Sequence, residues 1–437
     1  MRGASWSLWR GMDTSLQTER TARHGLRALL ASGSFRRLWA VGALGNAMRF
    51  SDTLAAALFT WQVTGSGFEV AVVSAMRALP MLLFGAFAGV VSDSVNRKAI
   101  LQWGMVVSGA ASASVCALAA AGVLRPWHVA VAAFVGGTVW ATEMSTRRRM
   151  CGEAAGAALM GRAVALDSLT NAMTRGIGPL VGGAIFATLG AVGAYAVSAV
   201  CFVLAALLIP GVRHVQETRR LTLGRVPRDL AEGLAYARTD PTVRAVLLVT
   251  IVMNCFAFSY SALVAPLALV VFRVSQALSG LMASSEAFGS LLGGIVLAAV
   301  TPRTRANVLM VGGSVAFLLC AMAMTQMPNY WLACAMLVLG GIGSALFGNM
   351  QTTLVLTRVP PAVRSRQMGL ITVCIGFGPV GQLMIGALAE RLGPQAAVLC
   401  SAVVGLVLLL VVGAWWGRAE RRAAGGTGRA DDLLAGG

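Results

Sequence analysis

Gly176-Ile177-Gly178-Pro179, followed by Gly182-Gly183, recurs 200 residues later as Gly376-Phe377-Gly378-Pro379, followed by Gly381 and Gly386. No other Gly-x-Gly-Pro stretch occurs in the chain, which indicates two copies of one unit. Small residues let helices approach closely, and a proline leaves one carbonyl without its helical partner, which favours a bend. Two interpretations stay open, close helix contact or a moving bend, for Gly178, Pro179, Gly182, Gly183, Gly378 and Pro379.

Apolar stretches of about 20 residues surround this repeat, and each can cross a hydrocarbon core of roughly 30 Å as a helix. With 57% hydrophobic residues, 12% charged residues and a mean hydropathy of +0.75, the chain is unlike a soluble protein. The sequence predicts twelve membrane spans, at residues 38–61, 68–91, 99–122, 127–146, 164–189, 191–210, 245–271, 278–300, 307–326, 330–351, 367–389 and 395–416. Because the repeat offset corresponds to six spans, we expect an all-α membrane fold of two pseudo-symmetric six-helix bundles, 34–210 and 245–416.

The excess of positive charge is unevenly placed. The chain has 35 Arg and Lys against 17 Asp and Glu, a net charge of +18. Of the 35, 29 lie in the tails and in alternate loops, whereas Arg125, Arg273 and Arg391 lie in the opposite loops. This distribution follows the positive-inside rule and predicts that both termini are cytoplasmic. We therefore interpret the charge as contact with membrane lipids and expect no nucleic-acid partner.

Three polar segments complete the predicted domain plan. Residues 1–33 form a cytoplasmic tail without the apolar run of a signal peptide. Residues 211–244 form a central cytoplasmic loop, in which Leu230 and Leu234 within Pro227–Arg238 predict a short helix on the inner membrane face. The Gly-rich residues 417–437 are expected to be an unstructured cytoplasmic tail.

Metal and enzyme chemistry have little support in the sequence. The eight cysteines form no Cys-x-x-Cys pair, and the three histidines show no ligand spacing. No cluster of His, Asp, Glu or Ser/Lys suggests catalysis, and the tails are too short for a soluble sensor domain. We expect no metal, no cofactor and no catalytic residue, and a monomer that binds a small-molecule substrate.

The loop between the second and third spans reads Gly89-Val90-Val91-Ser92-Asp93-Ser94-Val95-Asn96-Arg97-Lys98. It resembles the G-x-x-x-D-R-x-G-R-[RK] motif of the major facilitator superfamily of transporters. Gly89, Asp93, Arg97 and Lys98 match, whereas Ser94 and Asn96 replace an arginine and a glycine. Asn is the least costly substitute for a glycine in a left-handed turn, so the replacement at Asn96 is physically mild.

The resemblance implies a gate at the cytoplasmic end. Asp93 would face the start of the eleventh span, near Arg364 and Arg366, where a helix dipole favours a carboxylate. Arg97 would pair with Glu143 at the inner end of the fourth span. These contacts would lock the two bundles while the transporter faces outward. The alternative is that the loop is simply a tight basic turn.

Further matches narrow the resemblance. The G-P-x-x-G-G antiporter motif is matched by Gly178, Pro179, Gly182 and Gly183. The bacterial efflux branch that includes the enterobactin exporter is resembled by residues 146–148 and 165–169. The resemblance implies a transporter of the bacterial cytoplasmic membrane that exports a siderophore or drug by alternating access, driven by the proton gradient. Ala130–Trp140 lacks the arginine usual in proton-coupled drug exporters. An importer or uniporter stays open as an alternative, as does, from another class, a membrane-embedded sensor or enzyme.

Six ionisable residues inside the predicted spans are candidate functional residues, because an unpaired charge within a membrane costs several kcal/mol. They are Arg49, Asp52, Arg77, Asp167, Arg175 and Glu286. Three are positive and three negative, so one interpretation is complete internal pairing that fixes helix packing, which the contexts of Arg77 and Asp167 favour. A carboxylate removed from water holds a proton more readily, so Asp52 and Glu286 are the predicted proton carriers.

Polar and aromatic residues near these charges predict an adaptable, partly apolar pocket. The candidate lining residues are Asn46, Trp61, Gln62, Asn171, Asn254, Phe256, Phe258, Tyr260, Asn349, Met350 and Gln351.

Overall fold

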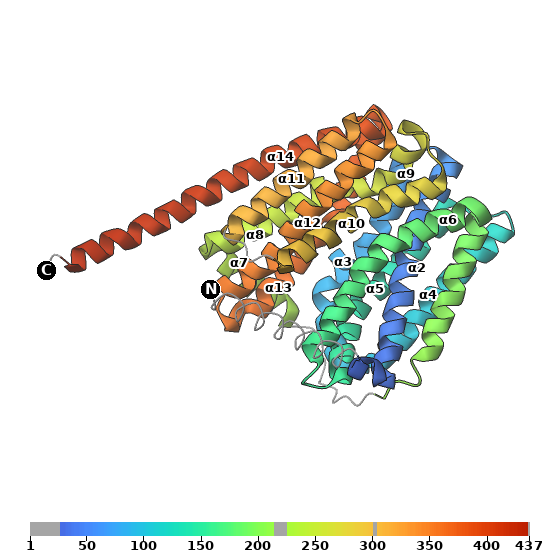
Figure 1. Ribbon diagram of the computed structural model, residues 1–437, viewed down its shortest axis with the longest axis horizontal. Helices are drawn as coiled ribbons and strands as arrows, with labels where there is room; N and C mark the ends of the chain where they lie inside the picture. Colours follow the sequence, from blue (N-terminus) through green and yellow to red (C-terminus); the bar gives the residue numbers. More distant parts are fainter. Residues whose placement is uncertain (1–26, 214–224, 300–303, 436–437) are drawn as a thin grey trace, which may run out of the picture.

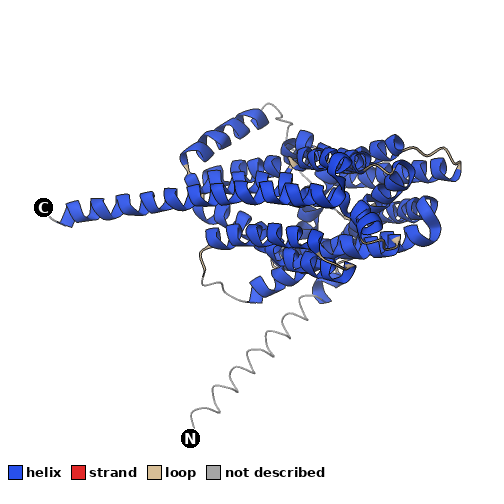
Figure 2. Cartoon of the chain, turned by 90° about the horizontal axis from the view of Figure 1, so that it is seen from above, coloured by secondary structure: helices blue, strands red, loops and turns tan. Residues whose placement is uncertain are grey.

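The described part of the chain is helical. The computed structural model describes residues 27–213, 225–299 and 304–435, and these ranges contain no strand (Figure 2). Within them, the side chains of residues 88–94, 225, 362 and 423–435 lie outside the description. The elements are α2 (Gly33–Thr64), α3 (Gly67–Ser94), α4 (Arg97–Ala120), α5 (Pro126–Ala155), α6 (Met160–Leu208), α7 (Arg225–Thr239), α8 (Pro241–Val252), η1 (Met253–Ala257), η2 (Phe258–Leu263), α9 (Val264–Pro266), η3 (Leu267–Val271), α10 (Gln276–Ala299), α11 (Ala306–Gln326), α12 (Tyr330–Arg358), α13 (Pro361–Ile375) and α14 (Gly378–Ala435).

Eight helical stretches of the described chain are long and apolar enough to cross a membrane. They are Gly67–Phe87, Arg97–Ala120, Met160–Leu208, Pro241–Val271, Gln276–Ala299, Ala306–Gln326, Tyr330–Arg358 and Val363–Arg422. The helices α2 and α5 are also long, at 32 and 30 residues, but are not among the eight. Both carry charged side chains in their interior, such as Arg49 in α2 and Glu143 in α5, which lower their hydropathy. The fold is thus an all-helical multi-pass membrane fold.

Two glycines reverse the chain inside the longest helices. Gly190 in α6 has φ 63° and ψ −162°, and Gly393 in α14 has φ 80° and ψ 161°. Residues that carry a side chain rarely adopt these backbone conformations, so glycine is required at both turns. Gly190 separates the predicted spans 164–189 and 191–210, and Gly393 lies between 367–389 and 395–416. The chain therefore turns where the sequence predicts a loop.

The stretch 245–271, predicted as one regular span, is irregular. After α8 the chain passes through the π-helical segment η1, the 3-10 segment η2, the single turn α9 and a second π-helical segment, η3. Pro266 lacks the backbone N–H that a regular α-helix would use at this point. Such departures from α-helical winding re-aim side chains and occur often at functional sites.

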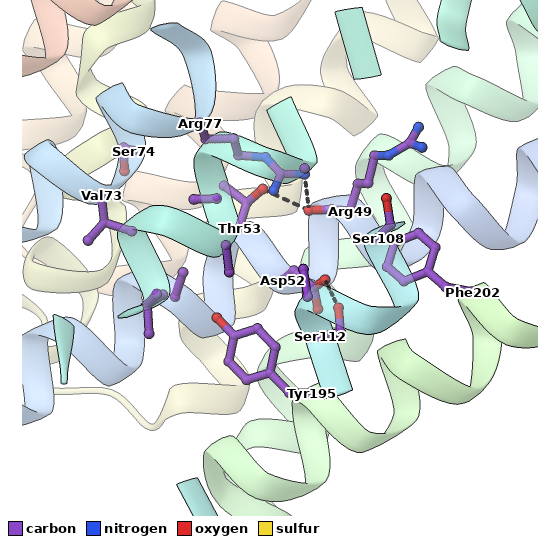
Figure 3. A pocket seen from close by; sticks show the side chains of 16 residues that line it. Arg49, Asp52, Thr53, Val73, Ser74, Arg77, Ser108, Ser112, Tyr195 and Phe202 are labelled. Carbon is purple, nitrogen blue, oxygen red and sulfur yellow. Dashed lines mark hydrogen bonds between the residues drawn. The ribbon is translucent and has the colours of Figure 1, made fainter. Parts of the chain in front are cut away.

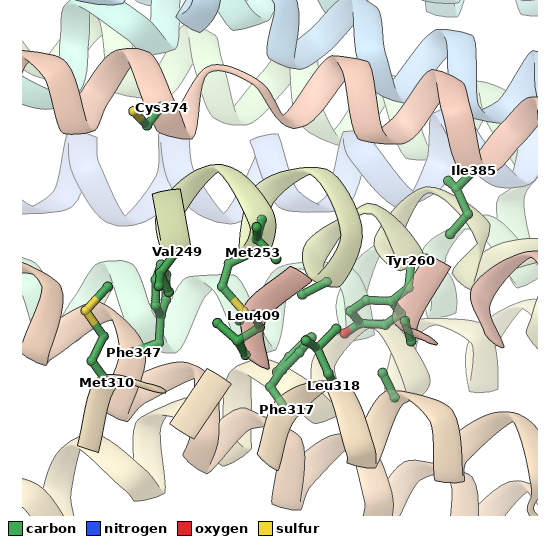
Figure 4. Packing of buried hydrophobic residues seen from close by; sticks show 14 of the residues in the cluster. Val249, Met253, Tyr260, Met310, Phe317, Leu318, Phe347, Cys374, Ile385 and Leu409 are labelled. Carbon is green, nitrogen blue, oxygen red and sulfur yellow. The ribbon is translucent and has the colours of Figure 1, made fainter. Parts of the chain in front are cut away.

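The apolar core falls into separate clusters. The largest contains residues of α7 to α14 alone, and its centre includes Met253, Phe317, Leu318 and Leu409 (Figure 4). One of the two smaller clusters is built from 29–212, and the other from α2 to α6 with Ala265 added. Most apolar burial is therefore within α2–α6 or within α7–α14, which we call the N-half and the C-half.

The two halves meet at one end and separate toward the other (Figure 1). At the meeting end, the Ser66 hydroxyl donates to Glu390 at 2.9 Å. A methyl group at Gly183 of α6 would lie 2.7 Å from the carbonyl oxygen of Gln276, the first residue of α10. We call this the closed end, and the opposite end, where α7 and α13 begin, the open end.

The repeated glycines lie in close helix contacts. A methyl group would lie 2.7 Å from Phe50 Cβ if built at Gly178, and 2.6 Å from Ser51 Oγ if built at Gly182, so both glycines bring α6 against α2. The two Gly-x-Gly-Pro copies differ, because Pro179 lies inside continuous α6 whereas the second copy interrupts the helix between α13 and α14. Gly378 has open space around it.

One of the three predicted polar segments differs from expectation. The tail 417–437 was expected to be unstructured, but α14 continues as a projecting helix to Ala435 (Figure 2). Adding residues to an existing helix costs far less than nucleating one, which is why this extension stays helical. The predicted surface helix at Pro227–Arg238 is present as α7. Residues 1–26 of the predicted tail 1–33 lie outside the described chain.

Candidate functional site

A pocket inside the N-half surrounds Asp52 (Figure 3). We call it the inner pocket; its lining residues are Arg49, Asp52, Thr53, Ala56, Val73, Ser74, Arg77, Ser108, Ala111, Ser112, Val129, Ala132, Ala133, Gly136, Tyr195 and Phe202. Asp52 accepts hydrogen bonds from Ser112 of α4, at 3.4 Å, and from Ser198 of α6. Arg77 of α3 donates through Nη2 to the backbone carbonyl of Arg49, at 2.7 Å. Asp52 is thus held by hydroxyl groups and forms no ion pair with the described residues.

Beside the inner pocket, a chain of ion pairs joins α2, α5 and α6. Arg49 pairs with Glu143, Glu143 contacts Arg147 at 3.6 Å, and Arg147 pairs with Asp167. All four side chains are at most 5% exposed. Two positive and two negative groups balance one another, which is how buried charges are tolerated away from water. Arg49 and Asp167 are therefore each paired within the N-half.

One predicted ion pair is wrong. Arg97 was expected to pair with Glu143, but it lies 2.7 Å from Glu153, more than two helical turns further along α5. Glu143 is buried between Arg49 and Arg147 and faces the interior of the N-half. Arg97 begins α4 and therefore meets the end of α5, not its buried middle.

The motif loop itself is a helix cap. Asn96 has φ −57°, so its backbone is not left-handed, and its side chain accepts from the backbone N–H of Lys98, at 3.0 Å, and of Ala99. A side-chain amide oxygen that caps a helix start satisfies donors the helix leaves unpaired. Lys98 Nζ donates to the carbonyls of Pro210 and Val212, which ties the loop to the end of α6. The side chain of Asp93 lies outside the described part of the structure, as do all side chains of residues 88–94.

A second cavity lies between the two halves, and we call it the central cavity. It has a volume of about 340 Å³. Its lining residues are Phe50, Thr53, Leu54, Ala57, Ser74, Arg77, Trp140, Arg175, Pro179, Phe258, Tyr260, Ser261, Val264, Ala265, Ala283, Glu286 and Gln382. Arg175 of α6 pairs with Glu286 of α10 across the boundary between the halves. The irregular segment η2 contributes Phe258, Tyr260 and Ser261.

The central cavity and the inner pocket share a wall. Thr53, Ser74 and Arg77 line both of them. Arg77 therefore lies between Asp52 on one side and the ion pair of Arg175 and Glu286 on the other. Of the predicted polar and aromatic lining residues, Phe258 and Tyr260 line the central cavity.

Sequence reasoning missed Ser112, Ser198, Trp140 and Gln382. A serine in an apolar helix usually bonds to the carbonyl four residues earlier, so Ser112 and Ser198 carry no signal that they serve Asp52. Trp140 and Gln382 have a weak signal, since each is a polar or amphipathic residue within an apolar span.

A third cavity, the open-end cavity, lies between α3 and α5 on one side and α7 and α13 on the other. Its lining residues are Met81, Gly85, Ala86, Ala141, Met144, Ser145, Arg148, Arg149, Val226, Asp229, Leu230, Ser365, Arg366, Met368, Gly369 and Thr372. Arg366 lies 3.1 Å from Asp229 and 3.0 Å from Glu232. Gln367 donates to the carbonyl of Gly233 at 2.8 Å, so α7 is fastened to α13. Arg364 donates to the carbonyl of Val359.

Membrane-crossing helices in two groups, with a cavity lined by ionisable side chains between them, are the arrangement of a multi-pass membrane transporter. The chain belongs to the transmembrane secretion effector family of major facilitator transporters, whose sequence profile matches residues 25–419.

Named relatives agree with this class. The chain is 26% identical to the multidrug efflux pump Tap of Mycolicibacterium fortuitum over 379 residues, which cover 81% of this chain and 89% of that protein. It is 24% identical to the enterobactin exporter EntS of Citrobacter koseri, over 81% of this chain and 84% of that protein. Both relatives are exporters by name.

Solved structures show the same fold. A bacterial homologue of the human lysosomal transporter Spinster, in an inward-facing and occupied conformation, superposes with a TM-score of 0.70 at 16% identity, covering 89% of this chain and 96% of that one. The nucleoside transporter NupG superposes with a TM-score of 0.66 at 16% identity, covering 87% and 99%.

Proposed function

We propose that this protein exports a small organic molecule, a siderophore or a drug-like compound, by alternating access and in exchange for protons. The observation that carries the proposal is the central cavity, which both halves line and which the ion pair of Arg175 and Glu286 crosses. A site between two bodies becomes accessible from either side of a membrane when the bodies rock against each other. The direction of transport follows the two named relatives, a drug efflux pump and a siderophore exporter.

The proposal includes a topology. We place twelve spans, in two pseudo-symmetric bundles, in the bacterial cytoplasmic membrane as a monomer surrounded by lipid, with both termini in the cytoplasm. Arg148, Arg149 and Arg366 gather at the open end, which under the positive-inside rule is the cytoplasmic end. The closed end then faces outward, and the conformation described is one that receives substrate from the cytoplasm.

Asp52 is the proposed proton carrier. It is the part-buried carboxylate that hydroxyl groups hold, whereas the buried Glu143, Asp167 and Glu286 each contact an arginine within 4 Å. Adding a proton to a paired carboxylate leaves its arginine uncompensated, which is costly away from water. Asp52 avoids that cost, and Arg77 connects it to the central cavity. Glu286 is the second candidate.

The motif loop is the proposed cytoplasmic gate. In the open-end conformation Arg97 holds Glu153 and Lys98 holds the end of α6, so the loop is already fixed to the N-half. A rigid loop can present Asp93 to the start of α13 once the open end closes. The carboxylate would then meet the helix terminus near Arg364 and Arg366.

Transport into inverted membrane vesicles tests the export proposal. With the lumen acidified, the wild-type protein should concentrate either a lipophilic cation or an iron chelator inside the vesicles, and a protonophore should abolish accumulation. A vesicle that instead loses preloaded compound under the same gradient would favour the alternative, an importer. Equal movement with and without the gradient would favour a uniporter.

A further inference from the structure

Two residues that line the central cavity each carry a buried acceptor atom without a hydrogen-bond partner in the described structure. Glu286 accepts from Arg175 through Oε2, while its Oε1 has no partner within the described structure. The same holds for Gln382 Oε1, on α14. Both residues line the cavity on the side of the C-half. A buried acceptor without a donor is unfavourable, so a ligand that brings a donor group, such as an amine, gains affinity there.

Arg77 supplies hydrogen-bond donors to the central cavity from the side of the N-half. A guanidinium has five N–H donors, and Arg77 uses Nη2 on the backbone carbonyl of Arg49. It forms no ion pair with the described residues, although it lines both the inner pocket and the central cavity. Arg77 therefore offers a positive charge and unused donors to an acidic group.

Aromatic rings occupy the space between these polar groups. Phe50 and Trp140 come from the N-half, and Phe258 and Tyr260 from the C-half. Phe258 is held in place by an edge-to-face contact with Phe317, with ring centroids 5.1 Å apart. Rigid aromatic walls favour a flat apolar body, and a few placed polar groups fix its orientation.

We infer that the central cavity binds an aromatic zwitterion, with its amine at Glu286 and Gln382 and its acid at Arg77. A ligand with only an amine would leave the remaining donors of Arg77 unused, and a ligand with only an acid would leave the acceptors of Glu286 and Gln382 without a donor. A ligand with both charges satisfies both walls and joins the N-half to the C-half. This inference rests on the proposed function, because it takes the central cavity to be the substrate site.

Four forms of one scaffold test the inference. They are the dipeptide tryptophyl-phenylalanine, its N-acetyl derivative, its methyl ester, and the derivative blocked at both ends, titrated calorimetrically into the purified full-length protein in detergent. The free dipeptide should bind at least about tenfold more tightly than each blocked form. If it does not bind more tightly than all three, including the case in which none binds, the inference is wrong.

Two substitutions assign the ends of the ligand. Arg77→Gln should abolish the preference for a free acid but keep the preference for a free amine, and Glu286→Gln should do the reverse. Gln382→Leu should weaken the preference for a free amine without touching the ion pair of Arg175, which covers the case that Glu286→Gln fails to fold. Glu69→Gln and Arg125→Gln, both on exposed parts of the N-half, should leave all four affinities unchanged. The assignment is wrong if Arg77→Gln and Glu286→Gln each abolish both preferences. It is also wrong if neither substitution abolishes either preference.

Vesicle transport separates this inference from the proposed function. If the protein concentrates the lipophilic cation or the chelator under a proton gradient but shows no preference for the free dipeptide, export stands and the zwitterion site is wrong. If the free dipeptide binds with the predicted pattern but nothing is transported, the binding site stands and the export proposal fails.

Discussion

Arg175 on α6 pairs with Glu286 on α10, so an ion pair crosses from one half of the protein to the other at the central cavity. The glutamate side chain is 8% exposed, whereas the arginine side chain is 41% exposed. The pair therefore combines a buried anion with a cation that reaches the cavity. Because the two partners belong to different halves, any rocking of the halves changes their separation.

Reversing one charge of this pair should impair transport more than reversing both. Arg175→Glu places two carboxylates together, which repel each other and favour separation of α6 and α10. The double variant Arg175→Glu with Glu286→Arg restores an attractive pair. We expect vesicle transport to fall at least about tenfold in the single variant and to recover in part in the double variant. Equal loss in both would show that the residues act separately.

The chain of ion pairs inside the N-half should be essential for stability. Asp167→Asn leaves Arg147 with only the longer contact to Glu143, at 3.6 Å, in a site where the Arg147 and Asp167 side chains are at most 3% exposed. Removing one partner of a buried ion pair lowers the free energy of unfolding by about 3–5 kcal/mol. Thermal unfolding in detergent should show a clear loss of stability. Glu153→Gln is the matched control, because Glu153 is 45% exposed and an exposed pair contributes at most about 1 kcal/mol.

How far the sequence predicts this site depends on the residue. The charges of Arg175 and Glu286 are conspicuous in apolar spans, so both were found, but their pairing depends on how two helices far apart in sequence are rotated against each other. The same limit explains the error for Arg97, whose partner is Glu153. The turns at Gly190 and Gly393 follow from span length, whereas the π-helical turns of η1 and η3 depend on tertiary packing that no local pattern records.

Proton coupling should depend on Asp52. Asp52→Asn keeps the hydrogen-bonding shape of the side chain, so Ser112 and Ser198 retain a partner, but it removes the exchangeable proton. Accumulation driven by the pH gradient should be lost, while exchange of labelled for unlabelled substrate without a gradient should continue. Glu286→Asn and Glu286→Gln serve as comparisons for the second candidate. Intact pH-driven accumulation in Asp52→Asn would move the proton site away from Asp52.

A methyl group at the closed end should force the halves apart. In Gly280→Ala, the new Cβ would lie 2.5 Å from the carbonyl oxygen of Pro179, and backbone atoms cannot yield as a flexible side chain does. Overpacking of this kind costs about 1–3 kcal/mol. In Gly280→Ala it destabilises the conformation in which the two halves meet at the closed end. Reactivity of a cysteine placed at Ser66 with an impermeant reagent should rise. Gly294→Ala, on the same helix but with nothing within 4 Å, should leave the reactivity unchanged.

The open-end cavity should narrow during each transport cycle. Ser145 on α5 and Ser365 on α13 line its opposite walls, and serine to cysteine is a mild change at both positions. In a background without the native cysteines, a short bifunctional reagent should join Ser145→Cys to Ser365→Cys only when the open end closes, and the joined protein should not transport. Addition of a proton gradient or substrate should change the rate of joining. The pair Ser145→Cys with Ser401→Cys is the control, because Ser401 is buried and bonded to the carbonyl of Phe256 inside the C-half. A joining rate for the first pair that never responds to gradient or substrate would mean that α5 and α13 keep a fixed separation, and alternating access would then require a different moving boundary.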